Sequence, residues 1–149
     1  MLQMKTDLLR VNRLEKTAAA WVLANGKTGL WVSFSATGVQ QVQTAGDLAV
    51  PIFTESNRDG SAGFTGDVSI TGKVTVLYGK MEAITDQFTG TPAVGDILYA
   101  LTDGTLANAT DGSITPVVGT QVPVAVCTKA STAMEWFGNS INVIEYVTL

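Results

Sequence analysis

Short runs of β-branched and aromatic residues, separated by turn-forming pairs, dominate the sequence. Asn25-Gly26, Asp59-Gly60, Asp103-Gly104 and Asp111-Gly112 each join a residue that tolerates positive φ to a glycine, as tight hairpins require. Valine, isoleucine, threonine and aromatic side chains fit a pleated surface, so the runs between these pairs are expected to be strands. This pattern predicts an all-β fold.

The first hairpin is expected to run from Thr17–Ala24 through Asn25-Gly26 to Gly29–Ser35, with Trp21 and Trp31 on its two arms. Later runs alternate apolar and polar residues or are apolar throughout, as strands buried on one or both faces do. The further strands expected are Asp47–Thr54, Asp67–Thr71, Lys73–Tyr78, Lys80–Thr85, Gly95–Thr102, Thr105–Ala109, Val122–Lys129 and Ile141–Thr148.

Three segments rich in turn-forming residues are expected to be loops between these strands. They are Ser56–Gly66, Thr110–Gly119 and Ala130–Ser140. A length of 149 residues suits one domain that buries its own core. We therefore expect a single β-barrel or β-sandwich domain over residues 17–149, preceded by a short N-terminal arm or helix over residues 1–16.

The N-terminal segment allows two conformations. Leu8, Val11 and Leu14 are spaced by three, as on a short helix, whereas Leu9 and Val11 also fit an extended arm. Residues 1–16 carry four basic and two acidic side chains, while the rest of the chain carries five basic and eleven acidic ones. A basic segment on an acidic body could reach toward an acidic partner surface, and it could equally be a solvated terminus.

The overall net charge of −4 argues against nucleic-acid binding, which needs a basic surface to neutralise phosphates. No apolar run approaches the roughly 20 residues that span a bilayer, so no membrane partner is expected. The first residues show no apolar core of a secretion signal. A lone cysteine, Cys127, forbids an internal disulfide and fits synthesis in a cytoplasm.

The residues available for catalysis are few. The chain has no histidine, which removes the usual general base and excludes Ser-His-Asp and Cys-His arrangements. Cys127 lies inside an apolar run, where a thiol packs as a small hydrophobe. Turn formation or strand entry explains six aspartates: Asp47, Asp59, Asp67, Asp96, Asp103 and Asp111. We expect no enzyme activity, no metal and no cofactor.

Candidate partner-binding residues fall in two places. One is the N-terminal segment, whose apolar and basic side chains could contact a neighbour. The other is the adjacent aromatic pair near residue 136, which could anchor a protein contact or cover the end of a barrel. The candidates are Leu8, Leu9, Arg10, Val11, Arg13, Leu14, Trp136 and Phe137.

Several stretches resemble a known family. They read TGKVTVLYGKMEAITDQFTGTPAVGDILYA from Thr71, PVAVCTKA from Pro123, INVIEYVTL from Ile141 and AAWVLANGKTGLWVSF from Ala19. With their "GKVTVL.G" strand, "TDQF" segment and late "PVA" strand, they resemble capsid decoration (cement) proteins of tailed bacteriophages. The likeness extends roughly from Ala18 to Leu149.

The resemblance implies a virion protein that is made in the host cytoplasm and binds the outside of the capsid shell. Its partner would be the major capsid protein, and it would stabilise the shell as a homotrimer. Two other functions stay open. One is a tail-tube or head–tail connector subunit, which would form rings of fixed symmetry. The other is a module that binds host glycans.

Overall fold

Antiparallel strands are the main secondary structure of the described chain. The computed structural model describes residues 2–5, 11–53, 72–136 and 138–149. Its largest sheet has six strands in the order β1-β7-β11-β10-β8-β9. The bounds are Leu2–Met4 for β1, Glu82–Thr85 for β7, Ile97–Ala100 for β8, Leu106–Asn108 for β9, Ala125–Trp136 for β10 and Asn139–Thr148 for β11.

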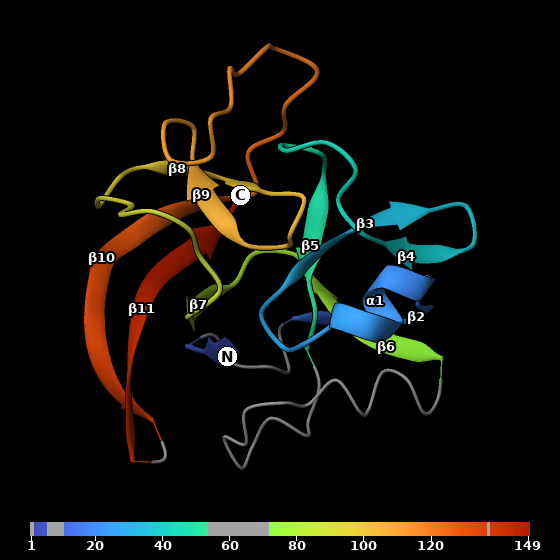
Figure 1. The fold of residues 1–149 in the computed structure, drawn as a ribbon, viewed down its shortest axis with the longest axis horizontal. Coiled ribbons are helices and arrows are strands. Elements are labelled where there is room, and N and C mark those ends of the chain that lie inside the picture. Colours follow the sequence, from blue (N-terminus) through green and yellow to red (C-terminus); the bar gives the residue numbers. More distant parts are fainter. Residues whose placement is uncertain (1, 6–10, 54–71, 137) are drawn as a thin grey trace.

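Two smaller sheets complete the fold. One pairs β2 with β6, and the other has the order β4-β3-β5. Figure 1 shows these sheets beside the large one, with α1, the one helix among the described residues, next to β4. The bounds are Asn12–Thr17 for β2, Ala20–Asn25 for α1, Trp31–Ser35 for β3, Gly38–Gln40 for β4, Ala49–Pro51 for β5 and Lys73–Tyr78 for β6.

The three-stranded sheet lies between two hydrophobic cores. Neighbouring strand residues point to opposite faces, so Trp31 and Ala49 enter the larger core while Val32 and Val50 enter the smaller one. Strand β6 also serves both, because Val74 and Val76 pack in the smaller core and Leu77 in the larger. The two cores are thus joined by strands that they share.

The all-β prediction is confirmed. Strand β6 matches the expected run exactly in its bounds, and β8 and β9 form the expected hairpin around Asp103-Gly104. Among the described strands, β1 and β9 are the two edges of the large sheet, and no ladder joins them. In the described part of the chain, this sheet is therefore open rather than a closed barrel.

The prediction of a first hairpin through Asn25-Gly26 is wrong, because Ala20–Asn25 is helical. Alanine and leucine have high helix propensity, and Val22 faces the smaller core with no exposed surface. The Asn25 side chain donates to the Trp21 carbonyl at 3.0 Å, and the Gly26 amide donates to the Val22 carbonyl at 2.7 Å. The Asn-Gly pair therefore ends a helix here rather than turning a hairpin.

The prediction of a loop over Ala130–Ser140 is also wrong. Strand β10 continues to Trp136 and pairs with β11 through Trp136–Asn139, so the two strands are only two residues apart in the chain. Small polar residues such as Ser131 and Thr132 can belong to a strand when a second strand, here β11, pairs with it. The loop expected over Thr110–Gly119 is confirmed, because it contains no strand. The loop expected over Ser56–Gly66 and the strand expected over Asp67–Thr71 lie outside the described residues.

The N-terminal segment contributes strands to the body. Strand β1 pairs with β7, and β2 pairs with β6 along its whole length, across the boundary expected after residue 16. Leu14 therefore lies on a strand rather than on the alternative helix. Leu8 and Leu9 lie outside the described residues.

Candidate docking surfaces

The structure separates the partner-binding candidates into different environments. Val11 is buried in the larger core, so its side chain packs inside the protein and is not offered to a partner. Arg13 is exposed, with its guanidinium carbon 5.8 Å from the centre of the Phe53 ring. Leu14 is partly buried and lines a groove. Leu8, Leu9, Arg10 and Phe137 lie outside the described residues, and Trp136 is partly buried at the end of β10.

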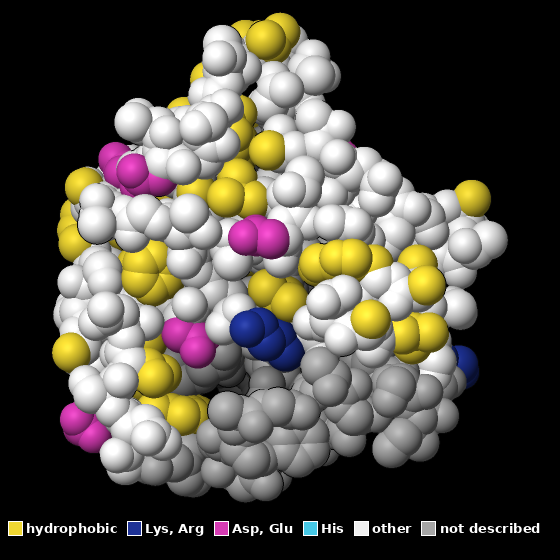
Figure 2. All heavy atoms as spheres, viewed as in Figure 1, with side chains coloured by type: hydrophobic (Ala, Val, Ile, Leu, Met, Phe, Trp, Pro, Cys, Tyr) yellow, Lys and Arg dark blue, Asp and Glu magenta, His cyan; other side chains and the backbone are white. Residues whose placement is uncertain are grey.

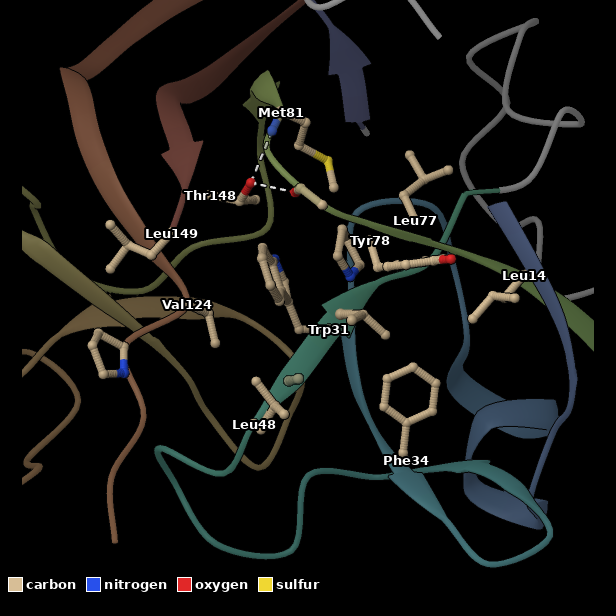
Figure 3. A pocket seen from close by; sticks show the side chains of 15 residues that line it. Leu14, Trp31, Phe34, Leu48, Leu77, Tyr78, Met81, Val124, Thr148 and Leu149 are labelled. Carbon is tan, nitrogen blue, oxygen red and sulfur yellow. Dashed lines mark hydrogen bonds between the residues drawn. The ribbon is translucent and has the colours of Figure 1, made fainter. Parts of the chain in front are cut away.

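An apolar groove of about 300 Å³ opens where the ends of several strands meet. Figure 3 shows Trp31 in the middle of its lining, with Leu14 and Phe34 to one side and Val124 and Leu149 to the other. None of the described residues that line it is charged. The described residues that line it are Leu14, Trp31, Phe34, Leu48, Ala49, Val50, Pro51, Leu77, Tyr78, Gly79, Met81, Pro123, Val124, Thr148 and Leu149.

The rim of this groove is formed by large apolar side chains that are open to solvent. They are Phe34, Leu48, Tyr78 and Leu149, and Leu48 keeps 59% of its surface exposed. Such a cluster is unusual on a surface unless something covers it in use. A signal for it is present in the sequence, because Leu48 and Tyr78 are apolar residues next to turns, where polar side chains are usual.

Hydrogen bonds hold the walls of the groove in place. The Thr148 hydroxyl donates to the Gly79 carbonyl at 2.7 Å and accepts from the Met81 amide at 2.8 Å. These bonds fasten the end of β11 to the turn between β6 and β7 (Figure 3). The groove is therefore a preformed feature of the fold, with little ordering left to do when a ligand or partner enters it.

A second candidate surface is the distal half of the β10–β11 hairpin, residues 128–136 and 138–143, called the ribbon below. Figure 1 shows β10 and β11 curving together along one side of the molecule. Strand β10 pairs with β8 only at Ala125 and Val126, and β11 pairs with β7 only from Ile144 onward. Within the described strands, both outer edges of the ribbon therefore lack a neighbouring strand.

The two faces of the ribbon differ. Residues that pair directly across an antiparallel ladder share a face, which places Met134 with Ile141 on one side and Glu135 with Ser140 on the other. Met134 and Ile141 are partly buried, while Glu135 and Ser140 are exposed. The ribbon is thus amphipathic, and along most of its length no other described strand pairs with its outer edges.

Ion pairs fix the base of the ribbon. Glu145 on β11 lies 2.7 Å from the Lys5 ammonium and 3.3 Å from that of Lys129. Lys5 also lies 2.7 Å from Glu82 on β7, and these contacts raise the pKa of Lys5 to about 12. The Lys5 ammonium, followed by that of Lys129, holds the pKa of the Glu145 carboxyl below its usual value.

The acidic side chains at turns have local structural partners. Asp47, Asp96, Asp103 and Asp111 each accept a hydrogen bond from a nearby or facing backbone amide. For Asp96, the Ala93 amide and the Asn108 side chain lower the pKa of the carboxyl. The turn role predicted for Asp103 and the strand-entry roles predicted for Asp47 and Asp96 are confirmed by these local bonds. The Asp111 carboxyl instead accepts from the amide of Thr91 in another segment, and Asp59 and Asp67 lie outside the described residues.

The described residues offer little for metal or nucleophilic chemistry. Across them, no group of three or more His, Cys, Asp and Glu side chains is placed to hold a metal ion. Cys127 is buried, and loss of solvation raises the pKa of its thiol, which keeps it in the less reactive protonated form. No helix within the described ranges is both long and apolar enough to span a bilayer.

Comparison with known proteins gives no family for this chain. No protein-family model matches it, and a search of curated proteins finds no match.

Proposed function

We propose that this chain is a structural protein of a tailed-bacteriophage particle that binds the outer surface of the capsid shell and stabilises it. The major capsid protein would be its partner, and copies of the chain would act together as a homotrimer. The observation that carries the proposal is the ribbon, in which an amphipathic pair of strands of the main sheet extends beyond the neighbouring strands β7 and β8.

The ribbon supports a docking role through its backbone. An edge strand displays unpaired N–H and C=O groups, and another chain can pair with them to extend the sheet. A two-stranded hairpin is marginally stable alone, so a long one that projects from a sheet gains order from a neighbour. The ion pairs of Glu145 hold its base in one orientation, which limits the entropy lost on docking.

Stabilisation of a shell follows from mass action. A ligand that binds the assembled state better than the separated subunits shifts the equilibrium toward assembly. A cement protein therefore needs a rigid body and contact surfaces. The all-β body, whose two hydrophobic cores are joined by strands that contribute to both, provides the rigidity. The resemblance in "GKVTVL.G" and "TDQF" supports the assignment to the capsid exterior.

The test uses purified protein and empty capsid shells of the phage that encodes it. In a trimmed variant, residues 133–142 are replaced by Asn-Gly, which closes a two-residue hairpin between the paired Thr132 and Val143. We expect the intact chain to co-sediment with shells and to raise their melting temperature. The trimmed variant should fold, as judged by its own melting transition, and should bind far more weakly.

Failure of the intact chain to bind the shells would contradict the capsid role. Equal binding by the trimmed variant would remove the ribbon as the contact surface. Six-fold rings in negative stain would instead favour a tail-tube subunit, and a reproducible hit on a glycan array would favour host attachment.

A further inference from the structure

A second exposed apolar feature projects from the body at the tip of the loop between β9 and β10. Val118 is fully exposed at this tip, and its neighbour Val117 keeps 54% of its surface open to solvent. Figure 1 shows the loop extending from the body, and Figure 2 shows hydrophobic side chains at its end. The stretch Ser113–Val122 has no charged residue. We call Val117–Gln121 the valine tip.

The valine tip is held in one conformation by its own hydrogen bonds. The Val117 amide donates to the Gln121 side-chain oxygen at 2.8 Å. The amides of Thr120 and Gln121 both donate to the Val117 carbonyl, at 3.0 and 3.1 Å. Gly119 has φ +85°, a left-handed conformation that glycine adopts readily. The two valines are therefore presented on a preformed turn.

The base of the loop is fastened to the body beside the groove. The Val122 amide donates to the Gly46 carbonyl at 2.7 Å, and the next residues, Pro123 and Val124, line the groove itself. Neither Val117 nor Val118 lines the groove of its own chain. One chain thus displays an apolar projection and an apolar hollow that it does not fill by itself.

We propose that the valine tip of one copy inserts into the apolar groove of a second copy. The tip and the described residues that line the groove carry no charge, so none of these side chains is an ion that would lose its solvation when they meet. A groove of about 300 Å³ has room for branched aliphatic side chains, and its exposed rim would close around them. Both surfaces are preformed, which limits the entropy lost on association.

The contact joins two different surfaces, so it is head-to-tail and generates either a closed ring or an open chain. A single turn in a groove is a small interface, so association is expected to depend on concentration. Ring closure would give each copy two such contacts. The inference deepens the proposed function and rests on it for its biological purpose, but its test uses the protein without capsids.

The experiment is sedimentation equilibrium on the full chain and on three variants up to about 1 mM, the range of weak specific contacts. Val118→Asp places a charge on the tip, and Leu48→Asp places one on the groove rim. Val94→Asp, at another exposed valine, is the matched control. We expect the wild type and the control to associate equally, and each of the first two variants to associate at least about tenfold more weakly.

Mixing supplies a sharper result. The Val118→Asp variant keeps an intact groove, and the Leu48→Asp variant keeps an intact tip. When the two variants are mixed, the tip of the second should enter the groove of the first and form a one-to-one dimer that neither variant forms alone. A monomeric wild type, unchanged association of Val118→Asp, an equal loss in the Val94→Asp control, or no dimer in the mixture would each overturn the proposal. Capsid binding by a strictly monomeric wild type would leave the capsid-binding role standing while removing this interface.

Discussion

Trp31 and Tyr146 pack ring against ring in the larger core, with centroids 5.9 Å apart and planes inclined at 56°. The indole N–H of Trp31 and the phenolic O–H of Tyr146 are both buried, and neither has a hydrogen-bond partner among the described residues. The pair contributes a large apolar surface, but it leaves two polar atoms desolvated without compensation.

Removing the phenolic oxygen should therefore stabilise the protein. Tyr146→Phe keeps the ring contact and deletes one unsatisfied group, so we expect the free energy of unfolding to rise by about 1 kcal/mol. Urea denaturation measures it, and Tyr78→Phe, at an exposed tyrosine, should change little. A loss of stability in Tyr146→Phe would mean that the hydroxyl is satisfied by a buried water.

Glu145 should make the stability depend on pH in the acid range. Its pKa is lower in the folded chain than in the unfolded one, so its contribution is full above the unfolded pKa and is lost as pH falls through the folded pKa. We expect Glu145→Gln to flatten the fall in melting temperature below about pH 5. Glu135→Gln, an exposed carboxylate on the ribbon, is the control. An unchanged acid limb in Glu145→Gln would contradict the prediction.

Gly38 should tolerate no side chain. A Cβ there would collide with the carbonyl group of Thr17, where β4 approaches the end of β2. Gly95 also has positive φ, at +92°, but nothing lies near the position of its Cβ. We expect Gly95→Ala to cost about 1 to 2 kcal/mol through the backbone alone and Gly38→Ala to cost at least about 3 kcal/mol. Equal losses in urea unfolding would refute the steric argument.

Cys127 should be unreactive in the folded protein. Its side chain is buried, and its raised thiol pKa leaves little thiolate at neutral pH. We expect iodoacetamide to label it only as fast as the chain unfolds, so that urea accelerates labelling strongly when followed by mass spectrometry. Labelling of the native protein at the rate of the unfolded chain would show that the thiol is accessible.

Local sequence signals predicted the elements whose partners are close in the chain. The β8–β9 hairpin follows from Asp103-Gly104, because a glycine with positive φ sits where the turn needs one. The same kind of signal misled at Asn25-Gly26, where the alanine-rich stretch before it favours a helix that buries Val22. Turn chemistry alone does not reveal which element comes before the turn.

The candidate sites were less predictable, because they depend on residues far apart in the chain. The groove combines Leu14, Trp31, Tyr78 and Leu149 from four separate segments. The ribbon was hidden because small polar residues around Ser131 resemble a loop until the facing strand is known. Val117 and Val118 lie in a segment correctly expected to lack strands, but their exposure to solvent is visible only in three dimensions.

Strand β11 occupies the middle of the large sheet, between β7 and β10, although it is the last of the described strands in the chain. During synthesis, β7 and β10 would emerge first and would have no strand to join them until residues 139–148 had left the ribosome. The sheet therefore completes only after nearly the entire described chain is made, and its contacts span long sequence separations, which slows folding. Until then its apolar edges need protection, so co-expression with a chaperone should increase the yield of soluble protein.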